Sequence, residues 1–335
     1  MRGAGGSAVQ AGGERGAGPG RDRLAAIVAS VERRLAERQA QRPEAVLEAE
    51  AEAALQREPR RSLRAALAGG RHRPVPPIIA EIKRASPAAG RLARGGPAGF
   101  DPVEQARRYA AGGAAALSVV TEPDHFHGDP ADLARVRPLG LPVLRKDFIL
   151  TRYQLLESAV LGADAVLLIA RILPARELAR LLRAARDLGL EALVEVNDER
   201  DTEAALAAGA TLIGINHRDL RTFAVDPGRT ARLLPLLPAG VTVVAASGIA
   251  TPERALELHA LGVDACLVGE ALMRSGAPER WLARVGELAR ARPGGAGGGG
   301  SPVPSPGDGP GAGAGGQGGE AGEGLPPGDG RRKGR

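Results

Sequence analysis

The 335-residue chain is poor in several residue types, and each scarcity excludes a class of protein. A single cysteine, Cys266, excludes an internal disulfide and suits a reducing compartment, so we expect a cytoplasmic protein. No apolar run approaches the roughly 20 residues of a membrane span, and residues 1–23 lack the apolar core of a signal peptide. The five histidines show no metal-ligand spacing, so we predict no metal site.

Lysine is scarce as well. Only three of the 45 basic residues are lysines, namely Lys83, Lys146 and Lys333. Arginine serves wherever a surface cation is sufficient, so a lysine that remains indicates a position where a proton-transferring ammonium is needed. Asparagine is just as rare, with only Asn197 and Asn216.

The formal net charge of +6 raises the question of nucleic-acid binding. The basic residues are spread along the chain rather than gathered in the stripe of a nucleic-acid footprint, and the termini contain no aromatic residue that stacks a base. Mild positive charge suits a small anionic substrate equally well. We therefore expect a small anionic molecule as the partner, rather than nucleic acid or a membrane. We also expect a monomer. RNA binding through the Arg/Gly-rich termini is the weaker alternative.

Both ends of the chain have the composition of disordered segments. Residues 293–335 are dominated by glycine and proline and residues 1–21 are similar, so neither buries enough apolar surface to offset its chain entropy. Between them we predict one catalytic domain over residues 22–292. Its first part, residues 21–70, has apolar residues at helical spacing, and Pro43 suits the first turn of a second helix.

From residue 77, short β-branched runs alternate with amphipathic segments of helix length, which is typical of parallel strands joined by crossover helices. Glycines such as Gly113 and Gly162 precede the strands and indicate left-handed helix caps. Eight units predict an α/β fold, a closed (βα)8 TIM barrel with an N-terminal helical extension. The alternative, an open doubly wound sheet, usually carries a Gly-rich fingerprint that is missing here. The predicted strands are 77–83, 115–120, 142–146, 164–169, 190–195, 211–215, 241–246 and 264–268.

Charged and amide side chains fall at the predicted carboxyl ends of the strands, where (βα)8 barrels carry their catalytic groups. Strand alternation sends Glu81 and Lys83 to one side of the first strand, and Lys146, Glu195 and Asn216 fall at the ends of the third, fifth and sixth. Buried charges are costly unless paired, so one interpretation is a set of structural salt bridges. The two lysines together with the two glutamates favour a catalytic cluster.

Two further features of the loops point to a ligand. The four phenylalanines, Phe100, Phe126, Phe148 and Phe223, all fall in predicted βα loops, and their convergence predicts a pocket for a flat apolar ligand. A plug over the barrel is the alternative. The segments ASGIATPE and LVGEALM place a glycine at the start of the last two helices, the recurring phosphate position of barrels.

Seven segments then occur in a fixed order along the chain: IIAEIKRASPAAG, SVVTEPDHFHGDPADL, PVLRKDFI, ALVEVNDE, IGINHRDLRTF, ASGI and LVGEALM. Through them, residues 22–290 resemble indole-3-glycerol phosphate synthase, an enzyme family of tryptophan biosynthesis. The resemblance implies a decarboxylating ring closure of 1-(2-carboxyphenylamino)-1-deoxyribulose 5-phosphate. The products are indole-3-glycerol phosphate, CO2 and water, and no cofactor or metal takes part.

The resemblance also implies roles for individual residues. Lys146 is the general acid that protonates the ketose oxygen as the ring carbon attacks, and Lys83 orients the substrate and assists condensation or dehydration. Glu195 acts as a base near the anilino nitrogen, Glu81 pairs with Lys83, and Asn216 holds substrate hydroxyl and carboxylate groups. Substrate binding is assigned to Ser86, Phe126, Phe148, Arg218, Ser247, Gly248, Gly269 and Glu270.

Three positions depart from the usual pattern of that family. Ala246 stands where a glutamate precedes the Ser-Gly of the seventh strand, and Ala88 and Ala89 replace a serine and a lysine of the first loop. Both site lysines and Glu195 stay in place. Two alternatives remain open: an inactive or substrate-shifted paralogue, and another phosphate-binding barrel lyase such as a Schiff-base aldolase.

Overall fold

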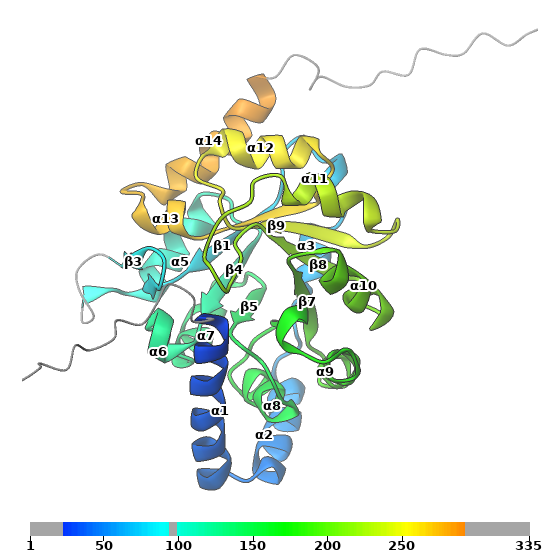
Figure 1. Ribbon diagram of the computed structural model, residues 1–335. Helices are drawn as coiled ribbons and strands as arrows, with labels where there is room; N and C mark the ends of the chain where they lie inside the picture. Colours follow the sequence, from blue (N-terminus) through cyan, green and yellow to red (C-terminus); the bar gives the residue numbers. More distant parts are fainter. Residues whose placement is uncertain (1–22, 94–98, 292–335) are drawn as a thin grey trace, which may run out of the picture. The chain divides into compact units, whose positions relative to one another are not determined.

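The computed structural model describes residues 23–93 and 99–291, in which eight parallel strands close into a barrel with helices around it (Figure 1). The segments predicted to be disordered, 1–21 and 293–335, lie outside the described residues. Around the barrel the hydrogen-bonded order is β1-β10-β9-β8-β7-β6-β5-β4. The barrel strands are β1 (Ile78–Ile82), β4 (Ala116–Val120), β5 (Val143–Lys146), β6 (Ala165–Ile169), β7 (Glu191–Val196), β8 (Leu212–Asn216), β9 (Thr242–Ala246) and β10 (Ala265–Val268).

Amphipathic helices follow the strands and cover the outside of the barrel. On α9, for example, Leu178, Leu181 and Ala185 lie on the buried face. The helices are α5 (Pro102–Ala111), α6 (Pro123–Phe126), α7 (Ala131–Val136), α8 (Arg152–Val160), α9 (Ala175–Asp187), α10 (Glu199–Ala207), α11 (Arg229–Leu233), α12 (Pro252–Ala260), α13 (Glu270–Arg274) and α14 (Pro278–Ala291). Single turns of 3-10 helix are η1 (Gly70–His72), η2 (Arg137–Leu139), η3 (Ala170–Ile172) and η4 (Leu234–Leu236).

The predicted barrel is confirmed, and every strand begins and ends within a single residue of its predicted range. The glycines explain this accuracy. A left-handed backbone costs an L residue about 1–2 kcal/mol, so a glycine in this conformation fixes where a helix stops and the next strand begins. Positive φ angles occur at Gly113, Gly140, Gly162, Gly189, Gly209, Gly240 and Gly262.

The loop after β1 contains a hairpin that was not predicted, formed by β2 (Ala85–Ser86) and β3 (Gly90–Arg91). Strands of two residues are too short for a period-two pattern to identify them. The hairpin matters because it places Ser86 and Ala88 beside the barrel mouth, where both line a cavity.

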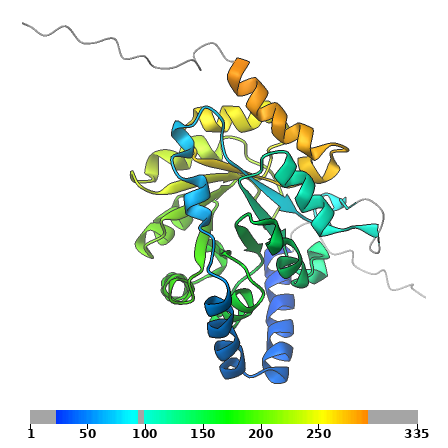
Figure 2. The same ribbon diagram turned by 180° about the vertical axis from the view of Figure 1, so that it is seen from behind.

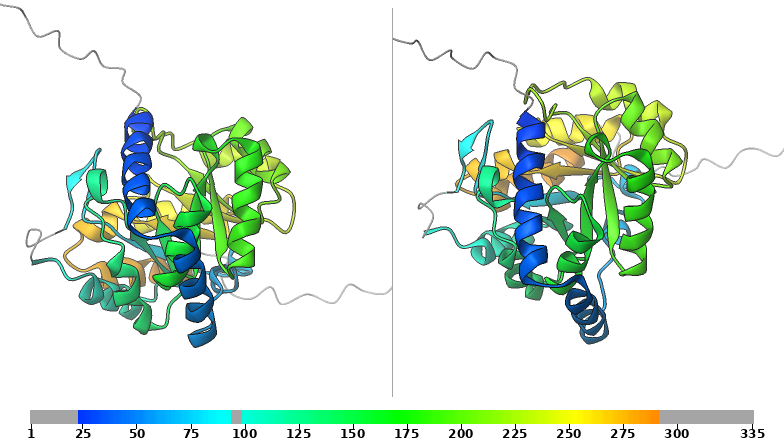
Figure 3. Two further views of the ribbon diagram at one scale, coloured as in Figure 1. Left: turned by 90° about the horizontal axis from the view of Figure 1, so that it is seen from below. Right: turned by 60° about the horizontal axis from the view of Figure 1, so that its bottom comes forward.

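An N-terminal extension of three helices precedes the barrel: α1 (Arg23–Gln41), α2 (Glu44–Arg57) and α3 (Leu63–Leu67). The first two run antiparallel (Figures 1 and 3). On α1, Leu24 and Ile27 belong to the same buried apolar cluster as Phe148 and Phe223, so α1 packs at the mouth of the barrel. Pro43 is the N-cap of α2 rather than a first-turn residue as predicted, because its ψ of 144° is extended.

The interior of the barrel is filled by branched apolar side chains. Ile79, Leu144, Leu167 and Val244 belong to one buried cluster that continues into the loops at the mouth. Such a packed interior leaves room for a ligand only at its ends. No helix in the two described ranges is long and apolar enough to span a membrane.

The segment between α2 and β1 crosses the barrel in the view from behind (Figure 2) and is attached to the amino-terminal strand ends. Asp164, just before β6, accepts hydrogen bonds at 2.9 Å from the backbone N–H groups of Arg61 and Val143. Its carboxylate also pairs with Arg137 at 2.9 Å. One buried acid thereby joins the extension to the start of β5.

Asp264, just before β10, joins the same N-terminal segment to a strand on the opposite side of the barrel. It accepts the N–H of Val243 at 2.9 Å and pairs with Arg71 of η1, whose Nε lies 2.9 Å from Oδ1. Burial raises the pKa of Asp264, but the hydrogen bonds from Arg71 and Val243 outweigh this effect, so its pKa lies below the usual value. Its stabilising contribution is therefore present at neutral pH and is lost as the pH falls through that lowered pKa.

We expect Asp264→Ala to lower the free energy of unfolding by about 2–3 kcal/mol at neutral pH, because the Val243 N–H and Arg71 lose their acceptor. Urea denaturation of the variant and of the wild type measures this difference. The control is Asp187→Ala at an exposed position. A loss no larger than in that control would contradict the assignment, as would a loss that persists unchanged at acidic pH.

Candidate active site

A cavity of about 580 Å³ opens at the carboxyl ends of the strands, within the size range of sites for small molecules. All the catalytic and substrate-binding residues that the family resemblance implies line this cavity. They are Glu81, Lys83, Ser86, Phe126, Lys146, Phe148, Glu195, Asn216, Arg218, Ser247, Gly248, Gly269 and Glu270.

Glu81 and Lys83 form an ion pair at the end of β1. Nζ of Lys83 lies 2.5 Å from Oε1 of Glu81, as expected for two residues on one side of a strand. Burial raises the pKa of Glu81, but the ammonium groups of Lys83 and Lys146 outweigh it and hold this pKa below its usual value. A Cβ on Gly269 would lie 2.2 Å from the same Oε1 atom, so the pair fits only beside glycine.

A second, looser pair links the ends of β5 and β7. Nζ of Lys146 lies 3.8 Å from Oε2 of Glu195. The other carboxylate oxygen, Oε1, is buried without a hydrogen-bond partner among the described residues. An unpartnered buried oxygen is costly, and both side chains line the cavity. The arrangement places an ammonium and a carboxylate at the same cavity.

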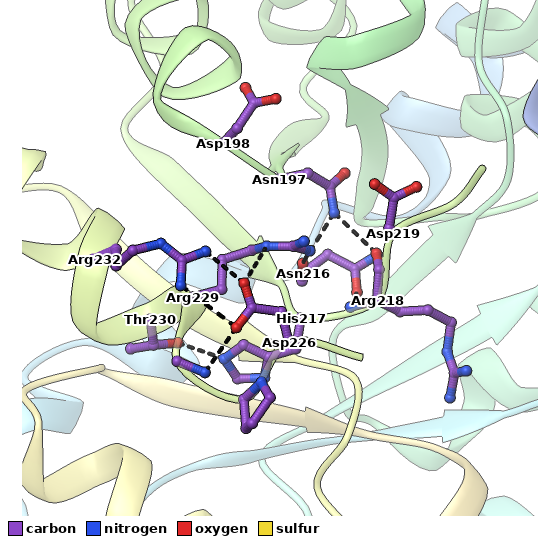
Figure 4. Close-up of polar contacts among 12 residues, drawn as sticks. Asn197, Asp198, Asn216, His217, Arg218, Asp219, Asp226, Arg229, Thr230 and Arg232 are labelled. Carbon is purple, nitrogen blue, oxygen red and sulfur yellow. Dashed lines mark hydrogen bonds and ion pairs between the residues drawn. The ribbon is translucent and has the colours of Figure 1, made fainter. Parts of the chain in front are cut away.

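Asn216 and Arg218 are held by two buried residues that the sequence prediction missed (Figure 4). The side-chain amide of Asn197 donates at 2.9 Å to the backbone carbonyls of both Asn216 and Arg218. Arg229 donates to the carbonyl of Asn216 from the other side. The rarity of asparagine already pointed to Asn197, but no spacing connected it to Asn216.

Phenylalanine rings form the apolar wall of the cavity. Phe126 and Phe148 lie 6.1 Å apart between centroids with their planes tilted by 39°, and Phe223 lines the same space. Glu122, missed by the sequence prediction, accepts the backbone N–H groups of residues 124–126 and so fixes the short helix that carries Phe126. Glutamate is not a favoured N-cap residue, so no residue pattern predicts this role.

Phe100 does not join the other three phenylalanines. The next residue, Asp101, is the N-cap of α5 and accepts the N–H of Val103 at 2.9 Å, which carries the chain toward the outer helix layer. Phe100 packs there against the apolar core, with the guanidinium carbon of Arg84 at 5.3 Å from its ring centroid. Helix capping therefore decides the direction of this ring.

The loops after β9 and β10 form the remaining wall. Ser247 and Gly248 adopt φ angles of +67° and +69° in a turn after β9. The prediction that this glycine starts a helix is wrong, because α12 begins only at Pro252. After β10, α13 begins at Glu270 directly behind Gly269, as predicted. The first N–H groups of a helix have no partner within it, so this wall suits an anionic group.

Charged side chains of both signs line the cavity. The cations are Lys83, Lys146, Arg218 and Arg274, and the anions are Glu81, Glu122, Asp147, Glu195 and Glu270. In the parts of the chain described by the structure, no group of three or more His, Cys, Asp or Glu side chains is placed to hold a metal ion. The site therefore offers acid–base groups, an apolar wall and an anion-binding wall.

Comparison with known protein families finds one whose model matches most of the described chain. The family described as indole-3-glycerol phosphate synthase matches residues 24–285. The chain belongs to the indole-3-glycerol phosphate synthase family. The enzyme named indole-3-glycerol phosphate synthase 2 of Streptomyces coelicolor is 47% identical over 256 residues, which is 76% of this chain and 95% of that relative.

Other comparisons agree with this membership. Indole-3-glycerol phosphate synthase of Sulfurimonas denitrificans is 47% identical over 209 residues, 62% of this chain and 78% of the relative. Among solved structures, 3-hexulose-6-phosphate synthase of Salmonella typhimurium has a TM-score of 0.51 at 14% identity and covers 64% of this chain and 98% of its own. At that identity the likeness concerns the fold alone.

The positions at which this member departs from the indole-3-glycerol phosphate synthase pattern lie at the mouth. Ala246 is buried in the same apolar cluster as Phe148 and Phe223, and Ala88 also lines the cavity. Ala89 contributes its backbone instead, accepting a hydrogen bond at 3.1 Å from Arg274. These alanines make the wall more apolar and leave both ion pairs intact.

Proposed function

We propose that the chain catalyses the ring closure of 1-(2-carboxyphenylamino)-1-deoxyribulose 5-phosphate. The aromatic ring carbon attacks the ketose carbonyl, and CO2 and water are lost to give indole-3-glycerol phosphate. As a decarboxylating carbon–carbon lyase, the enzyme would act in tryptophan biosynthesis. The observation that carries the proposal is the meeting of Lys146, Glu195 and the Glu81–Lys83 pair in one cavity of the family's barrel.

The three parts of the substrate correspond to three walls. The carboxyphenyl ring fits against the apolar wall formed by the rings of Phe126 and Phe148, and the phosphate fits the turn at Ser247 and Gly248 together with the start of α13. Arg218 suits the substrate carboxylate as an always-charged donor. The position of Asn216 at the end of β8 suits a hydrogen bond to a substrate hydroxyl.

The chemical steps need a proton donor at the ketose oxygen while the carbon–carbon bond forms. The ammonium of Lys146 supplies this proton, and the carboxylate of Glu195 lies 3.8 Å from it. Once CO2 has left, the hydroxyl must depart as water. Lys83, held by Glu81, assists that departure, while the carboxylate of Glu195 accepts a proton near the anilino nitrogen. No step requires a metal or a cofactor.

The remaining parts of the proposal concern context. The catalytic domain comprises residues 22–292, and its partner is a small phosphorylated molecule rather than nucleic acid or a membrane. A biosynthetic enzyme with one buried thiol, Cys266, suits the cytoplasm. We propose a monomer as the active form.

The test is an assay of indole fluorescence with purified protein and the carboxyphenylamino substrate. We expect indole-3-glycerol phosphate to accumulate, with CO2 released in equal amount. Borohydride added during turnover should trap no substrate on Lys83 or Lys146, since ring closure needs no covalent imine. Absence of turnover would favour an inactive or substrate-shifted paralogue, whereas a trapped adduct would favour a Schiff-base aldolase.

A further inference from the structure

His217 lies directly behind the site and has no role in the steps above. It follows Asn216 at the end of β8 and is 1% exposed. Its Nδ1 lies 2.9 Å from the backbone carbonyl oxygen of Ser247, and its Nε2 lies 2.7 Å from Oγ1 of Thr230 on α11 (Figure 4). The ring therefore joins the loop after β9 to the helix that follows β8.

The partners determine which ring nitrogen carries the proton. A carbonyl oxygen only accepts, so Nδ1 donates to Ser247. Burial lowers the pKa of His217, and the charges of Arg254 and Arg229 lower it further, against opposing effects of the Ser247 carbonyl and Asp226. The ring is then neutral at physiological pH, and Nε2 accepts a hydrogen bond from the Thr230 hydroxyl.

The carbonyl that His217 holds belongs to an unusual stretch of backbone. Ser247 is one of three non-glycine residues with positive φ among those described, and Gly248 continues the left-handed turn. This conformation is strained for a residue other than glycine, and it persists only where surrounding contacts hold it. A Cβ at Gly248 would lie 2.7 Å from Cγ1 of Val225, so the loop after β8 also packs closely beneath the turn.

We propose that His217 is a positioning residue that fixes the Ser247–Gly248 turn in the shape that receives the substrate phosphate. The inference rests on the proposed function, because that function places the phosphate there. His217 would then hold the turn through two hydrogen bonds. Its backbone N–H donates to the carbonyl of Ala246 at 2.9 Å, and its ring donates to the carbonyl of Ser247.

The decisive variant is His217→Leu, which fills much of the ring volume but has no donor. We expect its KM to rise about tenfold, the equivalent of a lost buried hydrogen bond, with kcat close to the wild-type value. The inhibition constant of inorganic phosphate should rise in parallel. His217→Asn keeps an N–H near the Nδ1 position and should restore most of the affinity, a rescue that a purely space-filling role does not predict.

The matched control is His259, whose ring also lies against two backbone carbonyls, those of Val263 and Arg73, but outside the cavity. His259→Leu should leave KM unchanged even where the melting temperature falls. If His217→Leu does not fold, Thr230→Val replaces it in the test. That variant removes the hydroxyl that holds the His217 ring, so KM should rise about threefold. An unchanged KM and phosphate inhibition constant in the variant that folds would overturn the proposal.

A binding measurement separates this inference from the proposed function. Inorganic phosphate should raise the melting temperature of the wild type and of His217→Asn but not of His217→Leu, and this readout requires no turnover. Suppose that phosphate does not raise the melting temperature of His217→Leu and that the wild type has no activity. This result would contradict the proposed function but support the positioning role. Full protection in His217→Leu would sink the positioning role alone.

Discussion

Lys146→Arg is expected to lower turnover at least about 100-fold, because a positioned general acid contributes about 10²–10⁴-fold. The guanidinium keeps the positive charge beside Glu195, but its pKa is well above that of an ammonium, so it is a poor proton donor. The melting temperature should stay near the wild-type value, since the Lys146 side chain is 22% exposed and makes one ion pair at 3.8 Å. Steady-state kinetics by indole fluorescence, with a thermal melt of the same sample, measures both quantities.

The control for this exchange is Lys333→Arg, because that residue lies beyond the part of the chain that matches the family. Its turnover should equal that of the wild type. Turnover of Lys146→Arg within a few-fold of the wild type would show that Lys146 acts only as an electrostatic anchor for the substrate. The proton would then have to come from another group, and Lys83 is the nearest candidate by chemistry.

Gly269→Ala is expected to lower kcat/KM by about 10- to 100-fold, the equivalent of losing a hydrogen bond between charged groups. The new methyl group would lie 2.2 Å from Oε1 and 3.2 Å from Cβ of Glu81, so the carboxylate has to move away from it. Lys83 then loses the partner that fixes its ammonium at 2.5 Å. The kinetic constants should be measured beside the free energy of unfolding.

Gly286→Ala on α14 is the matched control, because its new methyl group would meet the side chain of Arg290 at 3.5 Å, an ordinary van der Waals distance. It should leave kcat/KM unchanged and slightly favour the helix. Wild-type activity in Gly269→Ala would mean that the Glu81–Lys83 pair tolerates displacement. A loss of stability in that variant without a change in kcat/KM would assign the pair to folding alone.

The barrel and the composition of the cavity wall could be predicted from sequence because both depend on local patterns. Strand ends follow from β-branched runs bounded by left-handed glycines, and the rule that barrels act at strand ends then brings Lys83 and Lys146 together. What could not be predicted depends on contacts between loops. Asn197 reaches the carbonyls of Asn216 and Arg218 across a loop, and no sequence period records such a bond.

For Phe100, the sequence predicts the loop correctly but not the direction of the side chain. It lies in a βα loop like the other three phenylalanines, but the N-cap at Asp101 turns it toward the outer layer of helices. The loop assignment was right, whereas the direction of the side chain depended on a capping bond one residue later. The roles of the cavity residues, in contrast to their positions, stay predictions until the variants are measured.

The near-complete replacement of lysine by arginine gives the protein an unusual chemical selectivity. Of its three lysines, Lys83 and Lys146 line one cavity, with side chains 16% and 22% exposed. Amine-acylating reagents, which leave guanidinium groups intact, would therefore label the described surface almost exclusively inside that cavity. A substrate analogue that fills the cavity should shield both amines at once, so mass spectrometry of labelled peptides would report occupancy directly. A lysine-specific protease would likewise cleave the described part of the chain only after Lys83 and Lys146, and a ligand bound in the cavity would protect both positions.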